Sequence, residues 1–244
     1  MRPLLAAALS VLLAACAAAP PRNPLASWVP SRNFDARRPV LIVLHFTEQE
    51  SVQQSLDTLR SQNSGGRVSA HYLIGEDGRI YQLVADRDRA WHAGAGSWGT
   101  ITDLNSASIG IEIDNDGREP YTEAQFAALL TLLADLTTRL KIPKSQVIGH
   151  SDLAPSRKVD PGPHFPWQRL HEAGYGRWPG AGGAAPPGFD GWVALAAVGY
   201  PLKDRAAALR AFRMHFRGRD DGAQLAPAFD AEDLRILHAL SQAR

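Results

Sequence analysis

The sequence GHSDLAPSRKVDPGP at residues 149–163 places an imidazole, a cation and carboxylates in one proline-rich loop. It directly follows Gln146-Val147-Ile148, which reads as a short strand, so the loop begins at the rim of a sheet. Its prolines restrict the backbone, and a restricted loop can double back to bring Asp160 close to His150. We interpret the loop as half of a metal site.

The chain before this loop alternates between strand and helix patterns. The apolar run PVLIVL at residues 39–44 predicts a buried central strand. Further strands are predicted over 68–74, 79–84 and 106–114, and helices follow capping boxes that begin at Ser51 and Thr122, with a short helix over 166–174. The order predicts an α/β fold: a mixed central β-sheet flanked by helices.

Composition narrows the possible functions. The 244 residues carry a formal net charge of +1, which gives no strong field for nucleic acid, and no protein partner is evident. The single cysteine, Cys16, excludes a disulfide framework.

The first sixteen residues have the pattern of an export signal. Arg2 precedes an apolar run that is too short to span a bilayer. The run ends on Leu13-Ala14-Ala15-Cys16, which resembles a bacterial lipobox. The resemblance implies cleavage before Cys16 and lipidation of its thiol, hence a lipid anchor to a membrane. We expect a periplasm-facing lipoprotein, in the outer membrane because Ala17 follows Cys16; a soluble secreted protein is the alternative.

The remaining segments suggest a tether, a linker and a second domain. Residues 17–30 are rich in Ala and Pro and predict a tether, so the first domain is expected over 31–178. PGAGGAAPPG at 179–188 predicts a linker. Three amphipathic helices, beginning at Asp190, Asp204 and Asp230, predict a small three-helix domain over 189–244.

Two histidines of the first domain each lie at the end of a predicted strand. His45 and His150 each stand where a strand passes into a loop, and with Asp160 they form a donor set that suits Zn²⁺. Asp152 and His71 are rival ligands on spacing alone. The short loop favours Asp152 as a residue that supports the site or a turn, and His71 is interpreted as a cleft or core histidine. Glu112 lies between isoleucines in a run that reads as interior, where a carboxylate is costly unless it is paired or near a metal.

Five motifs in order carry a family resemblance. They are LHFT at 44–47, SAHYLI at 69–74, AWHAG at 90–94, SIGIE at 108–112 and the opening loop. Together they resemble the zinc-dependent N-acetylmuramoyl-L-alanine amidases, which share a fold with peptidoglycan recognition proteins. The similarity covers roughly residues 39–176.

The resemblance implies an activity and a set of site residues. It places zinc ligands at His45, His150 and Asp160, a catalytic carboxylate at Glu112 and a catalytic lysine at Lys158. The implied reaction is hydrolysis of the amide between the lactyl group of N-acetylmuramic acid and L-alanine of the stem peptide. The implied partners are peptidoglycan or muropeptides. The alternative is a non-catalytic recognition lipoprotein, a class that typically lacks a zinc ligand.

Other residues are candidates for substrate contact, each with a structural alternative. The candidates are His71, Trp91, His92 and Arg157. Trp91 and His71 are equally interpretable as core residues. The four histidines outside the motifs are expected to be surface or packing residues: His164, His171, His215 and His238. The C-terminal helices resemble the peptidoglycan-binding domain that accompanies many such amidases, and the alternative is a helical appendage that packs on the first domain and binds nothing.

Overall fold

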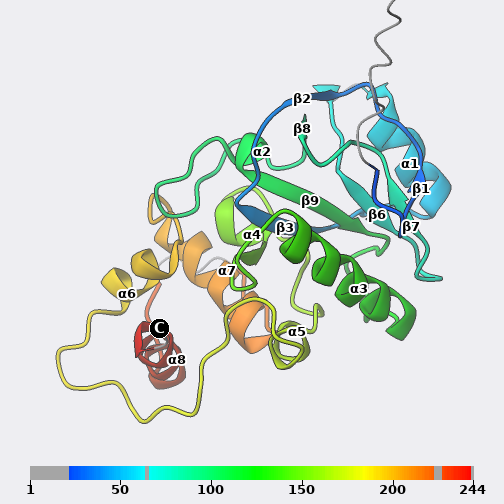
Figure 1. Cartoon of the computed structure of the whole chain (residues 1–244). Coiled ribbons are helices and arrows are strands. Elements are labelled where there is room, and N and C mark those ends of the chain that lie inside the picture. The colour runs from blue at the N-terminus through cyan, green and yellow to red at the C-terminus, as the bar shows by residue number, and fades with distance from the viewer. Residues whose placement is uncertain (1–21, 64–65, 223–226, 243–244) are drawn as a thin grey trace, which may run out of the picture.

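The computed structural model describes residues 22–63, 66–222 and 227–242 (Figure 1). The leader, Cys16 and the first part of the proposed tether lie outside these residues. Within the described ranges, no helix combines the length and apolar character needed to cross a bilayer.

A six-stranded sheet forms the centre of the molecule. Its strand order is β1 (Ser27–Trp28), β7 (Ile80–Gln82), β6 (Tyr72–Ile74), β9 (Ser108–Ile113), β3 (Leu41–Phe46) and β10 (Val147–Gly149). Only the β6–β7 pair is antiparallel, so the sheet is mixed, as predicted. Two small ribbons pair β2 (Phe34–Ala36) with β8 (Asp88–Ala90) and β4 (Gln62–Asn63) with β5 (Gly66–Arg67).

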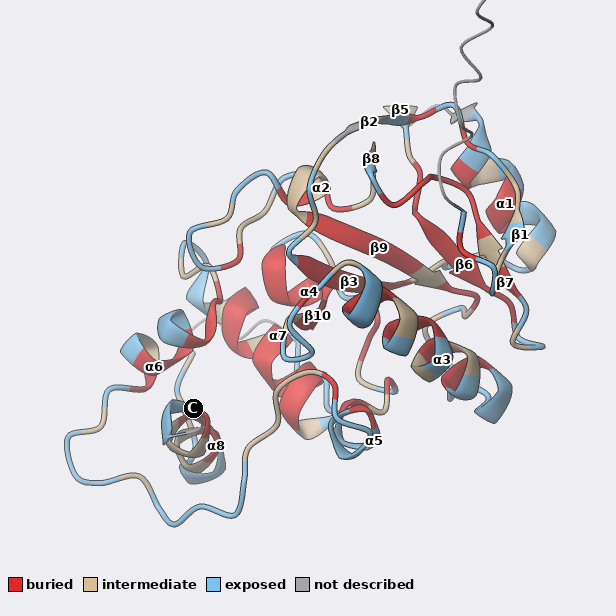
Figure 2. Ribbon diagram, in the orientation of Figure 1, coloured by how far each residue is buried: buried red, intermediate tan, exposed pale blue. Residues whose placement is uncertain are grey.

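Side chains alternate between the two faces of the sheet. The face that carries Ile42, Leu44 and Ile111 packs against α3 (Glu123–Arg139) in one hydrophobic cluster. The opposite face carries Leu41 and Val43, which belong to a separate cluster. Helices therefore cover both faces (Figures 1 and 2), which explains why these strands read as continuous apolar runs.

Side-chain caps fix where the helices begin. Ser51 caps α1 (Val52–Arg60) by accepting a hydrogen bond from the Gln54 backbone N–H, and Thr122 and Gln125 form the predicted capping box of α3. The strand predicted over 106–114 begins later, at Ser108, because the preceding residues form the short helix α2 (Leu104–Ala107). The remaining helices of this part are α4 (His150–Leu153) and α5 (Trp167–Glu172).

The predicted tether is too long. Asn23 is buried, with its backbone N–H 3.0 Å from Gln82 Oε1 and its side-chain amide 2.9 Å from Asp135 Oδ2. Strand β1 then pairs with β7 at the edge of the sheet. Residues 23–30 thus belong to the folded unit, although their composition is typical of a flexible segment.

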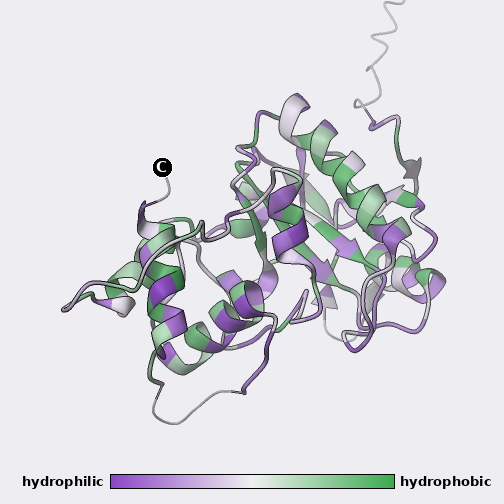
Figure 3. Cartoon of the chain, turned by 90° about the horizontal axis from the view of Figure 1, so that it is seen from below, coloured by the Kyte–Doolittle hydropathy of each residue, from purple (hydrophilic) through white to green (hydrophobic). Residues whose placement is uncertain are grey.

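Three C-terminal helices follow the glycine- and proline-rich segment at 179–188, which forms no helix or strand. They are α6 (Gly191–Val198), α7 (Arg205–Arg217) and α8 (Ala231–Gln242), as predicted. Most of α7 is buried, and apolar residues run through both the sheet and these helices (Figures 2 and 3). Phe212 of α7 lies in the same hydrophobic cluster as Leu41 and Ile148 of the sheet. The C-terminal helices therefore share a core with the first domain.

Candidate active site

Strand register brings the site residues together. His45 of β3 is the register partner of Glu112 of β9, and Leu44 is the partner of Gly149 of β10. Paired residues point to the same face of a sheet, so His45 and Glu112 share a face, while the flanking isoleucines of β9 point to the other face. His150 follows β10 directly and lies beside His45. The carboxyl ends of three adjacent parallel strands thus converge.

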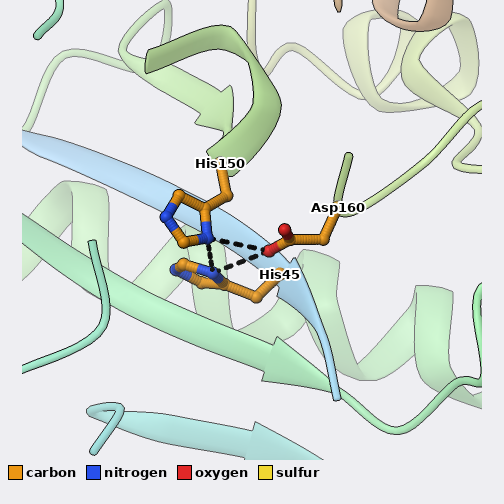
Figure 4. A group of neighbouring side chains, drawn as sticks. All are labelled: His45, His150 and Asp160. Carbon is orange, nitrogen blue, oxygen red and sulfur yellow. Dashed lines mark hydrogen bonds and ion pairs between the residues drawn. The ribbon is translucent and has the colours of Figure 1, made fainter. Parts of the chain in front are cut away.

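Three ligand atoms converge at this edge (Figure 4). His45 Nδ1 lies 2.9 Å from His150 Nδ1 and 2.9 Å from Asp160 Oδ2, and His150 Nδ1 lies 3.0 Å from the same oxygen. All three residues are buried. The loop doubles back as expected, since the Ser151 backbone N–H donates to the Asp160 carbonyl at 2.8 Å.

The donor chemistry of this group fits a metal cation. The Nε2–H of His150 donates to the Ala93 carbonyl at 2.9 Å, so its Nδ1 presents a lone pair toward the other two ligand atoms. Burial and then the charge of His150 lower the pKa of His45 to about 4, which keeps this imidazole neutral near pH 7. Burial raises the pKa of the Asp160 carboxyl, but its interactions with both histidines outweigh this and hold that pKa below its usual value. Two neutral imidazoles and a carboxylate are a common metal-binding set.

His92 contacts the distal ring nitrogen of His45, one of the three candidate metal ligands. His92 Nδ1 lies 3.0 Å from His45 Nε2, and its other ring nitrogen lies 3.3 Å from Ser108 Oγ. A Cβ at position 110 would lie 2.4 Å from the His92 ring, so Gly110 is required for this packing. A hydrogen bond to the distal nitrogen orients a ligating imidazole. His92 also lines the cleft, so contact with a substrate stays a prediction.

Glu112 points a free oxygen into the cleft beside the three ligands. Its Oε2 is buried and has no hydrogen-bond partner within the described part of the chain. Burial, followed by the charge of Asp160, raises the pKa of Glu112 well above its usual value, and the charge of Lys158 opposes this. A carboxyl with a raised pKa in a cleft is typical of an acid–base residue.

The cleft walls hold most of the other predicted residues. Lys158 and Trp91 both line it, and the Arg67 guanidinium lies 3.6 Å from the centre of the Trp91 ring. Arg157 also lines the cleft, but its Nη2 donates to the carbonyls of Ala93 at 2.6 Å and Ala95 at 2.8 Å. Arg157 therefore braces the loop that follows Trp91, in addition to any role toward a substrate.

Comparison with known proteins agrees with this geometry. Residues 35–163, more than half of the chain, match the family model described as N-acetylmuramoyl-L-alanine amidase. The chain belongs to this amidase family. The family's reaction is hydrolysis of the bond between N-acetylmuramic acid and L-alanine, and the amidase is accordingly a hydrolase.

Relatives of known sequence include one, AmiD, whose similarity extends beyond the matched residues. The amidase is 37% identical over 210 residues to N-acetylmuramoyl-L-alanine amidase AmiD of Escherichia coli, covering 72% of this chain and 74% of AmiD. It is 43% identical over 104 residues to 1,6-anhydro-N-acetylmuramyl-L-alanine amidase AmpD of Haemophilus influenzae, covering 42% of this chain and 56% of AmpD.

Solved structures share its fold. E. coli AmiD in complex with the substrate anhydro-N-acetylmuramic acid-L-Ala-D-γ-Glu-L-Lys superposes with a TM-score of 0.70 at 36% identity, covering 84% of this chain and 90% of AmiD. AmpDh3 from Pseudomonas aeruginosa gives a TM-score of 0.72 at 36% identity, covering 85% of this chain and 92% of that structure. Both structural matches cover a longer part of the chain than the family match at residues 35–163.

The structure corrects the assignment of His71 and decides between two readings of Asp152. His71 was a candidate substrate contact, but it is fully buried outside the cleft: its Nδ1 accepts from the Gly110 backbone N–H and its Nε2 lies 3.0 Å from the Asp88 carbonyl. For Asp152 the structure agrees with a supporting or turn residue and not with the rival reading as a ligand: its carboxylate accepts hydrogen bonds from Gly149, Tyr200 and His215 and lies outside the ligand group. Tyr200 was not identified from sequence, and His215 was expected only to pack.

The burial of neutral His71 predicts a pH effect on stability. Burial and then the charge of Arg37 lower the pKa of His71 well below its usual value. Below about pH 6.5 the unfolded chain therefore takes up a proton at this residue that the folded chain does not, so stability falls as pH falls, with a slope that approaches about 1.4 kcal/mol per pH unit. We expect a His71→Asn variant to show a shallower slope between pH 6.5 and 5, with the difference approaching this value toward pH 5, in urea unfolding of the metal-free protein. Equal slopes in both proteins would contradict a neutral His71.

Proposed function

We propose that the amidase cleaves the bond between the lactyl carbonyl of N-acetylmuramic acid and L-alanine with Zn²⁺ as its metal. The observation that carries this is the convergence of His45, His150 and Asp160 beside the free carboxyl oxygen of Glu112 in a single cleft. Zinc held by these three residues would act as a Lewis acid and lower the pKa of a water molecule to about 7. The ligand types fit zinc, and three protein ligands leave a position open.

The chain's own side chains account for the proton transfers. Glu112 Oε2 is free to accept a proton from the attacking water, and the same oxygen can then return that proton to the departing L-alanine nitrogen. A raised pKa makes the Glu112 carboxyl a stronger base than an exposed one, which suits a group that takes up a proton and later returns it. The Lys158 ammonium, on the cleft wall, would stabilise the negative charge that develops on the carbonyl oxygen.

We further propose that the substrate is peptidoglycan or a muropeptide released from it. AmiD and AmpDh3 have been solved with anhydromuramyl peptides, which supports a ligand of this class. The lipobox-like ending at Cys16 supports a lipid-anchored, periplasm-facing protein, in the outer membrane if Ala17 has its usual sorting effect. Mass spectrometry of the mature N-terminus tests the anchor, and an unmodified or absent Cys16 would contradict it.

Removal of the metal is expected to abolish activity. Purified protein should release peptides that begin with L-alanine from 1,6-anhydro-muropeptides, from intact sacculi or from both, as measured by mass spectrometry. Treatment with a chelator should reduce this release to background, because His45, His150 and Asp160 alone cannot activate water at neutral pH. Stoichiometric zinc should restore it.

Two controls separate the outcomes of this experiment. Metal analysis before and after chelation shows how much zinc each protein sample contains. Release of disaccharides instead of free stem peptides would identify a different bond specificity. A protein that binds zinc and sacculi but releases no peptide would contradict the enzyme and favour the recognition lipoprotein.

A further inference from the structure

A buried carboxylate joins the metal site to the C-terminal helices. Asp152 lies on α4, the single helical turn that starts with the metal ligand His150, and it is fully buried. Its Oδ2 accepts from the Gly149 backbone N–H at 2.7 Å and from His215 Nδ1–H at 2.7 Å. Its Oδ1 accepts from the Tyr200 hydroxyl at 2.6 Å. Two of the three donors are therefore side chains that follow the 179–188 segment.

Both donor side chains are held firmly in place. The His215 ring stacks on Trp167, with centroids 3.8 Å apart and an interplanar angle of 11°, and on Phe216 at 4.2 Å. Tyr200 is buried and packs edge-on against Trp98 at 5.3 Å. Burial and the neighbouring charge of Asp152 raise the pKa of Tyr200 well above its usual value, so its hydroxyl keeps the proton that it donates.

The helical turn that Asp152 anchors determines the positions of two of the three ligands. His150 is its first residue, and the Ser151 backbone N–H holds the Asp160 carbonyl at 2.8 Å. The packing around it is tight, because a Cβ at Gly149 would lie 2.9 Å from Pro161 Cδ. A displacement of α4 would move His150 directly and Asp160 through the loop. The position of α4 depends in turn on the three hydrogen bonds to Asp152.

We propose that Tyr200 and His215 are positioning residues for the metal site, so that the C-terminal helices complete this site instead of serving only as an appended module. The proposal rests on the metal-binding part of the proposed function. Neither residue lies in the ligand group, and both act through Asp152. Loss of a group that hydrogen-bonds a metal ligand directly weakens metal binding by about 10- to 100-fold, and an effect at the lower end of this range is expected for residues one step further away.

Tyr200→Phe removes one hydroxyl and tests the proposal with a matched control. The control is Tyr72→Phe, because Tyr72 is also buried and donates to a buried carboxylate, Asp86 Oδ1, at the same distance of 2.6 Å. Tyr72 faces the α3 side of the sheet, away from the ligands. We expect Tyr200→Phe to raise the zinc dissociation constant about 10-fold and to change the visible spectrum of the Co²⁺-loaded protein. Tyr72→Phe should change neither.

A pair of variants at His215 gives an independent test. His215→Leu removes the donor, whereas the amide nitrogen of Asn in His215→Asn can occupy the place of Nδ1 and donate to Asp152. Both variants lose the stacked ring, so packing losses are similar. We expect weaker zinc binding in the Leu variant and recovery of most of the affinity in the Asn variant.

Several results would overturn the proposal. One is a Tyr200→Phe protein that loses stability as Tyr72→Phe does but keeps wild-type zinc affinity and an unchanged Co²⁺ spectrum. Another is equal zinc affinity in His215→Leu and His215→Asn. Zinc affinity and the Co²⁺ spectrum are measured without substrate, so these results are distinct from a failure to cleave peptidoglycan.

Discussion

Replacement of Glu112 by Gln should lower kcat by about 10³-fold while the protein keeps one zinc per chain. Gln has nearly the same shape but cannot accept a proton from water. The side chain is outside the ligand group, and its Oε2 makes no hydrogen bond to any described residue, so the ligands should keep their positions. Single-turnover release of peptide from a defined anhydro-muropeptide measures the rate, and metal analysis measures zinc.

Glu48→Gln is the matched control for this variant. Glu48 lines the same cleft, so its replacement makes the same change in charge without touching the free oxygen beside the ligands. Near-wild-type activity is expected in Glu48→Gln. Full activity in Glu112→Gln, or equal losses in both variants, would remove Glu112 from the proton transfers.

Replacement of Lys158 by Met should lower kcat by about 10²-fold with little change in KM. The Lys158 ammonium lines the cleft and forms no ion pair with the residues that the structure describes, so its charge is available to the reacting carbonyl. Its charge also lowers the pKa of Glu112. The acid limb of the pH–rate profile should therefore shift to higher pH in Lys158→Met, because Glu112 then holds its proton more strongly.

A conservative variant separates charge from shape at this position. Lys158→Arg keeps a cation in the cleft and should recover part of kcat and most of the wild-type pH profile. Unchanged kcat in Lys158→Met would show that the lysine does not touch the reaction. A large rise in KM alone would assign it to substrate binding.

Much of the fold and the metal site followed from local patterns. The apolar run at 39–44, the capping box at Thr122 and the aspartates that start the C-terminal helices each act within a few residues, and each prediction was confirmed. The convergence of His45 and His150 was predictable because both follow parallel strands, whose carboxyl ends meet at one edge.

The features that sequence reasoning missed depend on contacts between distant residues. The burial of His71 depends on Gly110, nearly forty residues away, and Asn23 is anchored by Gln82 and Asp135. The link from His215 to Asp152 joins two predicted domains across 63 residues. No periodicity or spacing rule reports such pairings, because a histidine in an amphipathic helix looks the same whether it faces solvent or a buried carboxylate.

The hydrophobic cluster shared by the sheet and α7 makes the amidase a single cooperative unit. Leu41, Val43 and Ile148 are buried together with Leu209 and Phe212, so neither part keeps its full interior without the other. A chain truncated in the 179–188 segment, without the C-terminal helices, would expose this interior as an apolar surface that favours aggregation. A shortened chain of this kind would therefore need compensating polar substitutions on the sheet to stay soluble.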